Sequence, residues 1–488
     1  MIRTDKPIGA ESSVAKVRRS LRGIKAATDL ATLAGGQAAS KVLAFFAFAV
    51  LARMLMPSDY GAVETAAGMA AIGHMVIEFG SGTLGIRRVA SGTGTIPGVA
   101  AAAASSRLLA AAVIVPLLIA AYTVILGKQA PVLLFTLFGV SLFGAVFKLD
   151  WLLQAKDRMG AAAAGMTLKM AIFLAVILVC SPATFGVLAV GWAECLAMAA
   201  MGVYFLLAQR RVFGFGLRFA GWREGVAFFR ASAPLGLAGF AYTAAQSLPV
   251  LIVQAISSPS EAGEFGAAQR AIVSLLTFSW LYYQNLFPLL TRHITENPED
   301  ARQLIKNSDI FTGWSGAAAG VMLALGAEPL MRIAFGEALA GSASEFSVLA
   351  WCLPVTFASG SARWLLIAQD RQKSQLAVQV IAAAVTLIVA AGLAKPFGGL
   401  GAAMGSLAGA VTVWVLAAAF VRSCPVRPSL RHALAPAAAA AGAVLIATWM
   451  KLSPVTGAAA CGTGMILLGI ALPNVRRAFL FLMKAKRN

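Results

Sequence analysis

The stretch that decides the fold reads WLLQAKDR at residues 151–158, and the chain repeats it as WLLIAQDR at residues 364–371. The shared pattern is W-L-L-x-A-x-D-R, and the second copy follows 213 residues after the first. A second pair of related segments lies upstream, PSDYG at residues 57–61 and PSEAG at residues 259–263, 202 residues apart. Two motifs that recur in the same order at nearly the same spacing predict an internal duplication.

The composition indicates that the duplicated segments span a membrane. Hydrophobic residues make up 59% of the chain and charged residues only 12%, whereas about a quarter of a soluble domain is charged. Apolar stretches of about 20 residues, long enough to cross a bilayer as helices, recur from end to end. We therefore predict an all-α polytopic membrane protein, in which a duplication is typical of a transporter built from two related halves around a central site.

Fourteen transmembrane helices are predicted, as two parallel six-helix repeats followed by a C-terminal helical hairpin. They are expected near residues 29–52, 61–80, 100–125, 131–152, 160–181, 184–208, 228–256, 264–290, 308–327, 344–367, 375–394, 398–421, 433–450 and 455–472. Six helices separate the two copies of each motif, so the halves have the same orientation and are related by an axis along the membrane normal.

The basic residues orient these helices. The connections and tails on the side of the N-terminus hold 28 Lys and Arg, and the opposite side holds five. This asymmetry predicts a multi-pass protein of the bacterial inner (plasma) membrane with both termini in the cytoplasm. Because the net charge of +20 is spread over short connections, it favours contact with anionic lipids and argues against a nucleic-acid partner.

The predicted helices divide the chain into six parts. These are a basic cytoplasmic tail (1–27), an N-terminal six-helix half (28–208), a cytoplasmic amphipathic linker (209–227), a C-terminal six-helix half (228–421), an appended helix pair (433–472) and a basic cytoplasmic tail (473–488). Aromatic and basic residues interleave in the linker, which favours a helix lying at the membrane interface.

Charged residues inside a membrane are costly and therefore mark candidate functional sites. Lys41 lies near the middle of the first predicted helix and Arg270 about two turns into the eighth. A two-half bundle brings the first hairpins of both halves together along a central cavity, where such cations would bind an anion such as a pyrophosphate. Arg53, Arg230 and Arg363 are further candidates for this diphosphate site. The alternative for each is a cation that pairs with a neighbouring acid for stability alone.

Two other pairs of charged residues suggest roles in coupling and gating. His74 and Glu78 lie one above the other on the second helix, where a His–carboxylate pair is a candidate carrier of a coupling proton. A polar pair without transport function is the alternative. Asp150 and Arg363 directly precede the two octapeptides, and we predict that they approach and separate as a cytoplasmic gate closes and opens.

The remaining membrane charges have simpler interpretations. Glu64 lies one turn inside the second helix, where the helix dipole favours an acid. Lys169 is expected to pair with Glu194 between the fifth and sixth helices. Lys148 lies near a cytoplasmic helix end, from which its side chain can reach the interface, and the same interpretation is open for Asp150, Arg230 and Arg363.

No catalytic motif is present in the sequence. There is no GxxxxGK[ST] phosphate-binding loop, and no external loop is long enough for a transferase or ligase domain. Three histidines and five cysteines without a CxxC pair indicate no metal site. We therefore predict a protein that is not an enzyme and has no cofactor beyond H⁺ or Na⁺ as a coupling ion.

Several segments resemble the Wzx-type polysaccharide flippases of the multidrug/oligosaccharidyl-lipid/polysaccharide exporter superfamily. Residues 40–43 (SKVL) lead into residues 52–61 (ARMLMPSDYG), which match that family's A-R-x-L-x-P-x-D-Y-G turn. Residues 78–80 (EFG) with 86–88 (IRR) resemble the exit of its second helix, and residues 285–292 (NLFPLLTR) the exit of its eighth. The resemblance extends from about residue 28 to about residue 421.

This resemblance implies a flippase that translocates undecaprenyl-diphosphate-linked oligosaccharide repeat units by alternating access, for O-antigen (lipopolysaccharide), capsule or exopolysaccharide synthesis. A polysaccharide polymerase and a chain-length regulator are the implied protein partners. The related lipid II flippases place cations in a central cavity, and Lys41 and Arg270 look like counterparts of these. Their second basic residue in the first helix has no clear match, since residues 45–48 are FFAF, which argues against lipid II as the substrate.

Three other functions remain open at the level of sequence, and a lipid II flippase is one of them despite this mismatch. A drug/cation antiporter of the same superfamily would use the acidic residues Glu64, Glu78, Asp150 and Glu194. A non-transporting membrane scaffold of a polysaccharide-synthesis complex would tolerate the loss of the mid-span cations.

Overall fold

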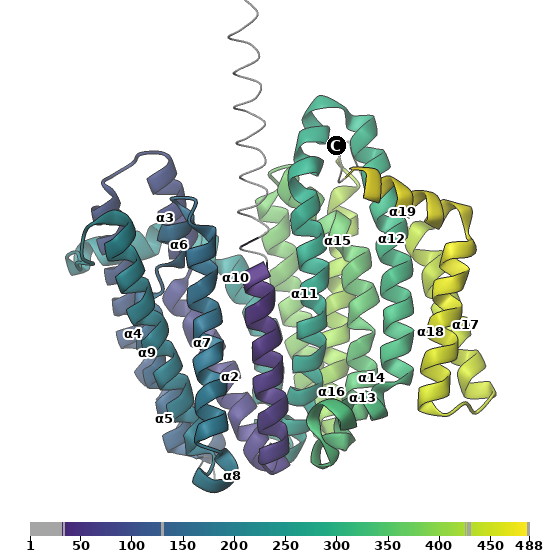
Figure 1. Ribbon diagram of the computed structural model, residues 1–488, viewed down its shortest axis with the longest axis horizontal. Coiled ribbons are helices and arrows are strands. Elements are labelled where there is room, and N and C mark those ends of the chain that lie inside the picture. Colours follow the sequence, from purple (N-terminus) through teal and green to yellow (C-terminus); the bar gives the residue numbers. More distant parts are fainter. Residues whose placement is uncertain (1–31, 33–34, 128–130, 425, 427–430, 486–488) are drawn as a thin grey trace, which may run out of the picture.

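The computed structural model describes residue 32 and residues 35–127, 131–424, 426 and 431–485. Every regular element in these residues is a helix. Ten of the helices are long and apolar enough to cross a membrane, and eleven if one bent pair counts as a span. The predicted all-α polytopic class is confirmed, and the helices stand side by side in two groups (Figure 1).

The N-terminal half begins with the first helix, Gly35–Met54. It continues with α2 (Pro57–Glu78), α3 (Ser81–Ala90), α4 (Ile96–Leu126), α5 (Val132–Ser141), η2 (Leu142–Phe147), α6 (Asp150–Gln154), α7 (Met159–Val179), α8 (Pro182–Phe185) and α9 (Leu188–Phe213). The fourth predicted helix is therefore divided into α5, η2 and α6.

The C-terminal half has longer helices. It contains α10 (Trp222–Ile256), α11 (Pro259–Glu296), α12 (Pro298–Leu325), α13 (Ala327–Phe335), η3 (Glu337–Ser342), α14 (Ala343–Ala350), α15 (Cys352–Ala368) and α16 (Gln372–Val421). The chain turns within α16 at Gly398, which has a φ of 54°. A Cβ added at Gly405 would lie 2.7 Å from the Ala390 nitrogen, so the two legs of α16 pack side by side as the predicted eleventh and twelfth spans.

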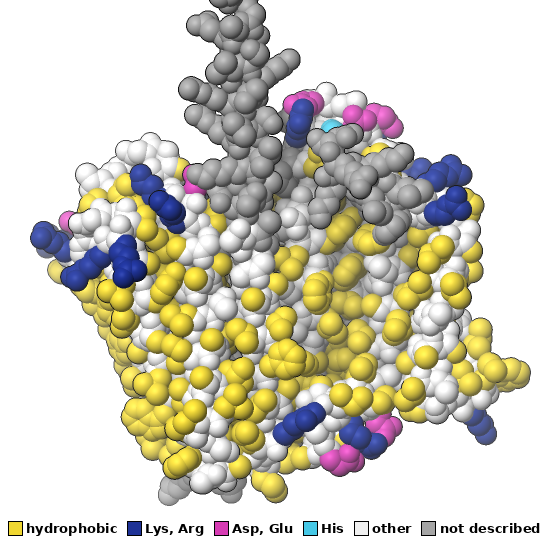
Figure 2. All heavy atoms as spheres, viewed as in Figure 1, with side chains coloured by type: hydrophobic (Ala, Val, Ile, Leu, Met, Phe, Trp, Pro, Cys, Tyr) yellow, Lys and Arg dark blue, Asp and Glu magenta, His cyan; other side chains and the backbone are white. Residues whose placement is uncertain are grey.

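Three helices follow the second half: α17 (Arg431–Trp449), α18 (Pro454–Ala471) and α19 (Pro473–Ala485). They pack against α12, where a Cβ at Gly462 would overlap the side chain of Met322. The appended pair therefore covers the outer flank of the second half (Figure 1). On the face seen in Figure 2, apolar side chains form a broad belt between two rims that carry Lys and Arg.

The linker between the halves differs from the prediction. Helix α9 runs on to Phe213, residues 214–221 are not helical, and α10 begins at Trp222. Gly214 ends α9 in the left-handed conformation with a φ of 73°, a common way for a helix to stop. The expected interfacial helix is thus wrong for residues 214–221.

The first octapeptide is a helix stop. Asp157 has a φ of 55°, and the Arg158 amide donates to the Leu153 carbonyl at 3.0 Å. The Asp157 amide donates to the Gln154 carbonyl, also at 3.0 Å. This is the Schellman arrangement, and aspartate is one of the few non-glycine residues that readily adopt its left-handed position.

The second octapeptide repeats these bonds. Asp370 has a φ of 56°, the Arg371 amide donates to Leu366 at 2.8 Å, and the Asp370 amide donates to Ile367 at 3.1 Å. The two leucines of each copy are buried and anchor the last turn. The duplication therefore preserves a local structure as well as a sequence.

The two Pro-Ser turns meet at the opposite end of the molecule. Pro57 starts α2 and Pro259 starts α11. A Cβ at Gly61 would lie 1.9 Å from the Pro259 oxygen, and one at Gly263 would lie 2.3 Å from the Pro57 oxygen. The backbones of α2 and α11 are thus in direct contact, and only glycine fits. We call this the proline end, and the opposite end, which contains both octapeptides, the tail end (Figure 1).

An insertion explains why the spacing of the repeats grows from 202 to 213 residues. The second half contains α13 and η3 between α12 and α14, with a bend of 75° between α12 and α13. This segment lies at the proline end (Figure 1). There Phe335 packs edge-on against Phe45 of the first helix, with ring centroids 5.7 Å apart.

Candidate functional site

A cavity of about 520 Å³ lies between the two halves. The first helix, α2, α7 and α9 contribute to its wall from the N-terminal half, and α10 and α11 from the C-terminal half. Along α2 it reaches from Glu64 to Met75, about 16 Å at 1.5 Å per residue. Its floor lies one helical turn from the contact between Gly61 and Gly263.

The two walls differ in chemistry. The N-terminal wall combines lysines with apolar side chains: Lys41, Lys148, Lys169, Phe45, Phe48, Phe138, Phe173, Met166, Met170, Met198 and Met201. The C-terminal wall has neutral hydrogen-bonding groups: Thr243, Gln246, Ser247, Gln269 and Ser274. Arg270 is the cation that this second wall contributes.

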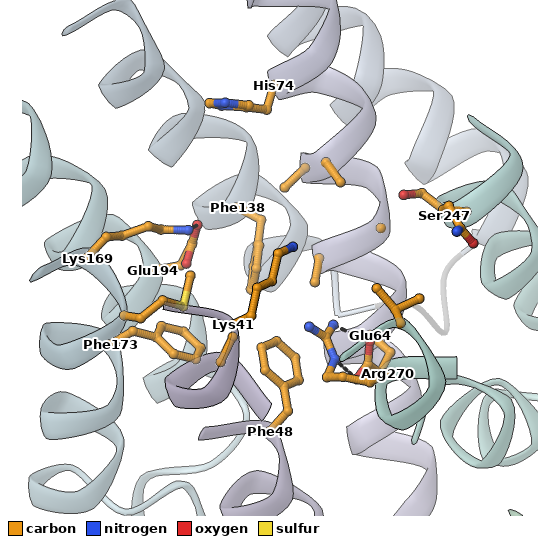
Figure 3. Close-up of a pocket in the computed structure, with 18 of the residues that line it drawn as sticks. Lys41, Phe48, Glu64, His74, Phe138, Lys169, Phe173, Glu194, Ser247 and Arg270 are labelled. Atoms are coloured by element: carbon orange, nitrogen blue, oxygen red, sulfur yellow. Dashed lines mark hydrogen bonds and ion pairs between the residues drawn. The ribbon is translucent and has the colours of Figure 1, made fainter. Parts of the chain in front are cut away.

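Lys41 and Arg270 both line the cavity, so the structure brings together the two mid-span cations (Figure 3). The Arg270 guanidinium donates to both carboxylate oxygens of Glu64, at 2.7 and 2.5 Å. It also lies 3.4 Å from the centroid of the Phe48 ring. The Glu64 side chain is only 6% exposed, and a buried bidentate pair of this kind is strong and directional.

A second ion pair lies on the other side of Lys41. Lys169 of α7 and Glu194 of α9 are 2.7 Å apart, which confirms the pairing predicted from the sequence. In Figure 3, Lys41 projects into the space between this pair and the Arg270–Glu64 pair. No ion pair within the described chain involves Lys41 itself.

Lys148, which lines the cavity, belongs to a polar cluster of the first half. Arg107, which is 1% exposed, donates to the Ser81 hydroxyl at 2.8 Å and to the Lys148 carbonyl at 2.5 Å. Glu78 lies 3.2 Å from the Lys148 ammonium and 3.8 Å from Arg107. The Lys148 ammonium also lies 3.7 Å from Asp150. We call these five residues the N-terminal cluster.

The matching place in the second half holds the C-terminal cluster, Tyr283, Asp309, Ser361 and Arg363. Ser361 donates to Asp309. The Tyr283 hydroxyl donates to the Phe357 carbonyl at 2.9 Å and lies 3.3 Å from the Ser361 hydroxyl. The two clusters occupy corresponding positions of the duplication. An offset of 202 residues relates Ser81 to Tyr283 and Arg107 to Asp309, and an offset of 213 relates Lys148 to Ser361 and Asp150 to Arg363.

Three of the predicted diphosphate ligands lie outside the cavity wall. Arg53 donates to the Ile333 carbonyl of α13, so it joins the first helix to the inserted segment at the proline end. Arg230 is exposed on α10. Arg363 belongs to the C-terminal cluster, where its Nε atom is buried without a hydrogen-bond partner in the part of the chain that the structure describes.

The positions of the predicted coupling and gating residues do not decide whether they have these roles. His74 lies 3.5 Å from Glu78 and lines the cavity, and Glu78 is shared with Lys148 and Arg107. Asp150 and Arg363 form no ion pair with each other among the described residues. Both roles stay predictions.

Sequence reasoning missed the role of two residues. Glu64 is held by Arg270 from the other half rather than by the helix dipole alone, and Lys148 faces the cavity rather than the interface. The repeat offset of 202 residues contained a signal for Glu64. It relates Glu64 to Gly266 and Arg270 to Gly68, so each charged residue has a glycine at the matching position of the other half. The hydroxyl and amide wall of α10 was also missed, because neutral polar residues do not stand out in a span.

Comparison with known proteins gives the family. The model of the family described as polysaccharide biosynthesis protein matches residues 27–294, which is more than half of the chain. The chain belongs to this family. No curated protein matches its sequence.

Solved structures show the fold that this family member shares. The lipid II flippase MurJ in an inward closed conformation superposes with a TM-score of 0.74 at 10% identity, covering 89% of this chain and 97% of that one. An inward-facing multidrug resistance MATE transporter of the MOP superfamily has a TM-score of 0.63 at 16% identity, with 78% and 94% covered. An outward-facing MATE structure scores 0.50 at 13% identity, with 81% and 95% covered. The fold is thus that of MurJ and the MATE transporters.

Proposed function

We propose that this protein moves undecaprenyl-diphosphate-linked oligosaccharide repeat units from the cytoplasmic to the periplasmic leaflet of the bacterial inner membrane by alternating access. The observation that carries the proposal is the position of Lys41, with Arg270 and Lys169 beside it, in a cavity between two duplicated halves. Membership of the polysaccharide biosynthesis family supports a saccharide cargo.

The chemistry of the two walls suits the two parts of such a headgroup. A diphosphate cannot cross hydrocarbon unaided, because burying an unpaired charge is too costly, and lysine and arginine side chains are its natural partners. Sugar hydroxyls both donate and accept hydrogen bonds, as do the serine, threonine and glutamine side chains of α10 and α11. The diphosphate is therefore assigned to the N-terminal wall with Arg270, and the sugars to the C-terminal wall.

The direction of transport follows from the predicted orientation. The bias of Lys and Arg favours a cytoplasmic location for the tail end. The proline end then faces the periplasm, and the contact between Gly61 and Gly263 closes that side. A substrate is thus loaded from the cytoplasm in this conformation.

A drug/cation antiporter is disfavoured by the partners of the acidic residues. Glu64 is paired with Arg270, Glu194 with Lys169, and Glu78 with Lys148. A cationic drug would have to break these pairs next to the positive charge of Lys41. Efflux of ethidium from vesicles tests this alternative, and we expect none.

Reconstitution tests the proposal directly. The purified protein is placed in vesicles with a fluorescent diphospho-prenyl oligosaccharide, and the label exposed on the far leaflet is measured. The Lys41→Ala, Arg270→Ala double variant should lose transport, whereas Arg211→Ala, at an exposed site on α9, should keep it. Size-exclusion profiles verify that both variants are folded.

Normal transport by a folded double variant would refute the site assignment. Absence of transport by the unmodified protein, with normal polymer yield in cells that carry the double variant, would favour the scaffold alternative.

A further inference from the structure

The anion-binding part of the cavity already contains two anions. Lys41 is flanked by the carboxylates of Glu64 and Glu194, each bound to a cation that the substrate would use (Figure 3). Arg270 and Lys169 are near enough to repel Lys41 electrostatically. A diphosphate therefore meets Lys41, which has no ion pair among the described residues, and two cations that already bind carboxylates.

The Glu64–Arg270 pair differs from the other pair because it joins the two halves. Residue 64 of α2 corresponds to Gly266 of α11, and Arg270 corresponds to Gly68, at the offset of 202 residues. A Cβ at Gly266 would lie 2.6 Å from the Glu64 Cγ. Glu64 thus fills the space that a side chain at the matching position would need, and reaches the arginine one turn further along α11.

This pair also lies next to the closed proline end. The Tyr60 hydroxyl donates to Glu64 at 2.7 Å, and Gly61 follows Tyr60 in the contact with α11. Tyr60 is fully buried. The carboxylate that occupies the cavity floor is therefore continuous with the contact that closes the periplasmic side.

We propose that Glu64 is an internal counter-ion which the substrate diphosphate displaces from Arg270, and that this displacement releases the contact between α2 and α11. The inference rests on the proposed function. Both the carboxylate and a phosphate bind the guanidinium through two parallel hydrogen bonds, so they compete for the Nε and Nη2 donors that Glu64 holds. A diphosphate carries more charge than a carboxylate and can bind Lys41 at the same time.

Competition of this kind couples binding to opening. A ligand shifts a conformational equilibrium only if it binds one state more tightly than the other. While α2 and α11 are in contact, Glu64 occupies Arg270 and weakens the site; after they separate, Arg270 is available. The substrate therefore favours the state with the proline end open, and the return of Glu64 to Arg270 helps to expel it afterwards.

The Lys169–Glu194 pair provides the matched control. Both of its residues belong to the N-terminal half, on α7 and α9. Neutralising Glu194 frees a cation for the substrate without removing a bond between the halves. The Glu64→Gln and Glu194→Gln variants thus separate coupling from simple attraction.

A labelling experiment in nanodiscs tests the proposal. The five native cysteines are replaced by serine, and Ala262, fully buried beside Gly263, is changed to cysteine as a reporter of the proline end. Labelling by a charged maleimide is measured with and without farnesyl diphosphate. In the Glu64-intact protein this probe should raise the labelling rate about tenfold, within the 5- to 150-fold range of typical coupling between sites.

Glu64→Gln should label at the raised rate without the probe and bind farnesyl diphosphate about tenfold more tightly. Arg270→Gln should also label without the probe, and the Glu64→Arg, Arg270→Glu double variant should return towards the slow rate. Glu194→Gln should remain dependent on the probe. Size-exclusion profiles restrict the comparison to folded protein.

Slow, probe-dependent labelling of both Glu64→Gln and Arg270→Gln would overturn the inference while leaving transport by the unmodified protein intact. Fast labelling of these variants in a protein that neither binds the probe nor transports the oligosaccharide would instead overturn the proposed function and retain the ion pair as a lock between the halves.

Discussion

In the N-terminal cluster an arginine of α4 lies among a hydroxyl, a carbonyl and a carboxylate, whereas an aspartate of α12 occupies the corresponding place in the C-terminal cluster. Arg107 contacts Ser81 and Lys148. Asp309 accepts from Ser361, which in turn lies next to Tyr283. The same three predicted spans meet in each half, namely the second, third and fourth, which are α2–α3, α4 and α5–α6 in the first half and α11, α12 and α14–α15 in the second.

The difference shows what duplication preserves. The points where the helices meet have been kept, because backbone packing there determines the bundle. The side chains at those points have diverged to opposite charge, since each cluster needs only to satisfy its own hydrogen bonds. The two clusters can therefore be tested against each other, position by position.

The largest effect is expected at the buried arginine. Arg107→Met should lower the free energy of unfolding by about 3–5 kcal/mol, because it removes a buried cation from partners that stay behind. Asp309→Asn should cost less, about 1–3 kcal/mol, because the amide oxygen still accepts from Ser361. Thermal unfolding in detergent compares the two. Equal losses would show that the clusters are equivalent despite their charge.

A smaller effect is expected where the halves are alike. Gly61→Ala and Gly263→Ala should each open the proline end and cost about 1–3 kcal/mol, since a Cβ at either position overlaps backbone of the other helix. Gly392→Ala is the control, because nothing lies within 4 Å of its Cβ. Maleimide labelling of a cysteine at position 262 and thermal unfolding provide the measurements. A clear difference in labelling rate or stability between the two variants would show that the two sides of this contact are not equivalent.

The octapeptides should respond alike to a change at their aspartate. Asp157→Val and Asp370→Val each force a β-branched residue into the left-handed conformation, at a cost of about 1–2 kcal/mol. Asp157→Gly and Asp370→Gly should remain close to the unmodified protein, because glycine adopts this conformation readily. Unfolding midpoints of the four variants test this. Tolerance of valine in one copy alone would mean that only the other stop is needed.

The smallest effect concerns the predicted gate. Asp150→Arg and Arg363→Asp should each slow oligosaccharide transport, and the double variant should recover about 0.5–1 kcal/mol of coupling, or roughly two- to fivefold in rate. The vesicle assay measures all three. Strictly additive losses of transport rate would show that Asp150 and Arg363 do not interact, and would refute the predicted gate.

The sequence was sufficient for the fold because hydrophobic length and repetition are properties of the chain alone. Each of the fourteen predicted spans falls on a helix of the described residues, and the Lys169–Glu194 pair was predicted between neighbouring helices. Position along a helix, however, does not give its rotation. Arg53 therefore faces the carbonyl of Ile333 rather than the cavity.

Contacts between the halves were the other limit. Glu64 and Arg270 are separated by 206 residues, and no local sequence pattern predicts the ion pair between them. The neutral wall of α10 escaped notice for a related reason, since glutamine and serine in a span carry no strong signal until their direction is known. The break at residues 214–221 was obscured by the aromatic and basic residues that surround its glycines.

The Glu64–Arg270 bond also has a consequence for the history of the gene. In a symmetric dimer of identical six-helix subunits, positions 64 and 266 would hold the same residue at the axis, and two glutamates there would repel each other. One side must lose its side chain before the other can carry the acid. The bond could arise only after the two copies had become different sequences, and it now prevents either half from being exchanged for a second copy of the other.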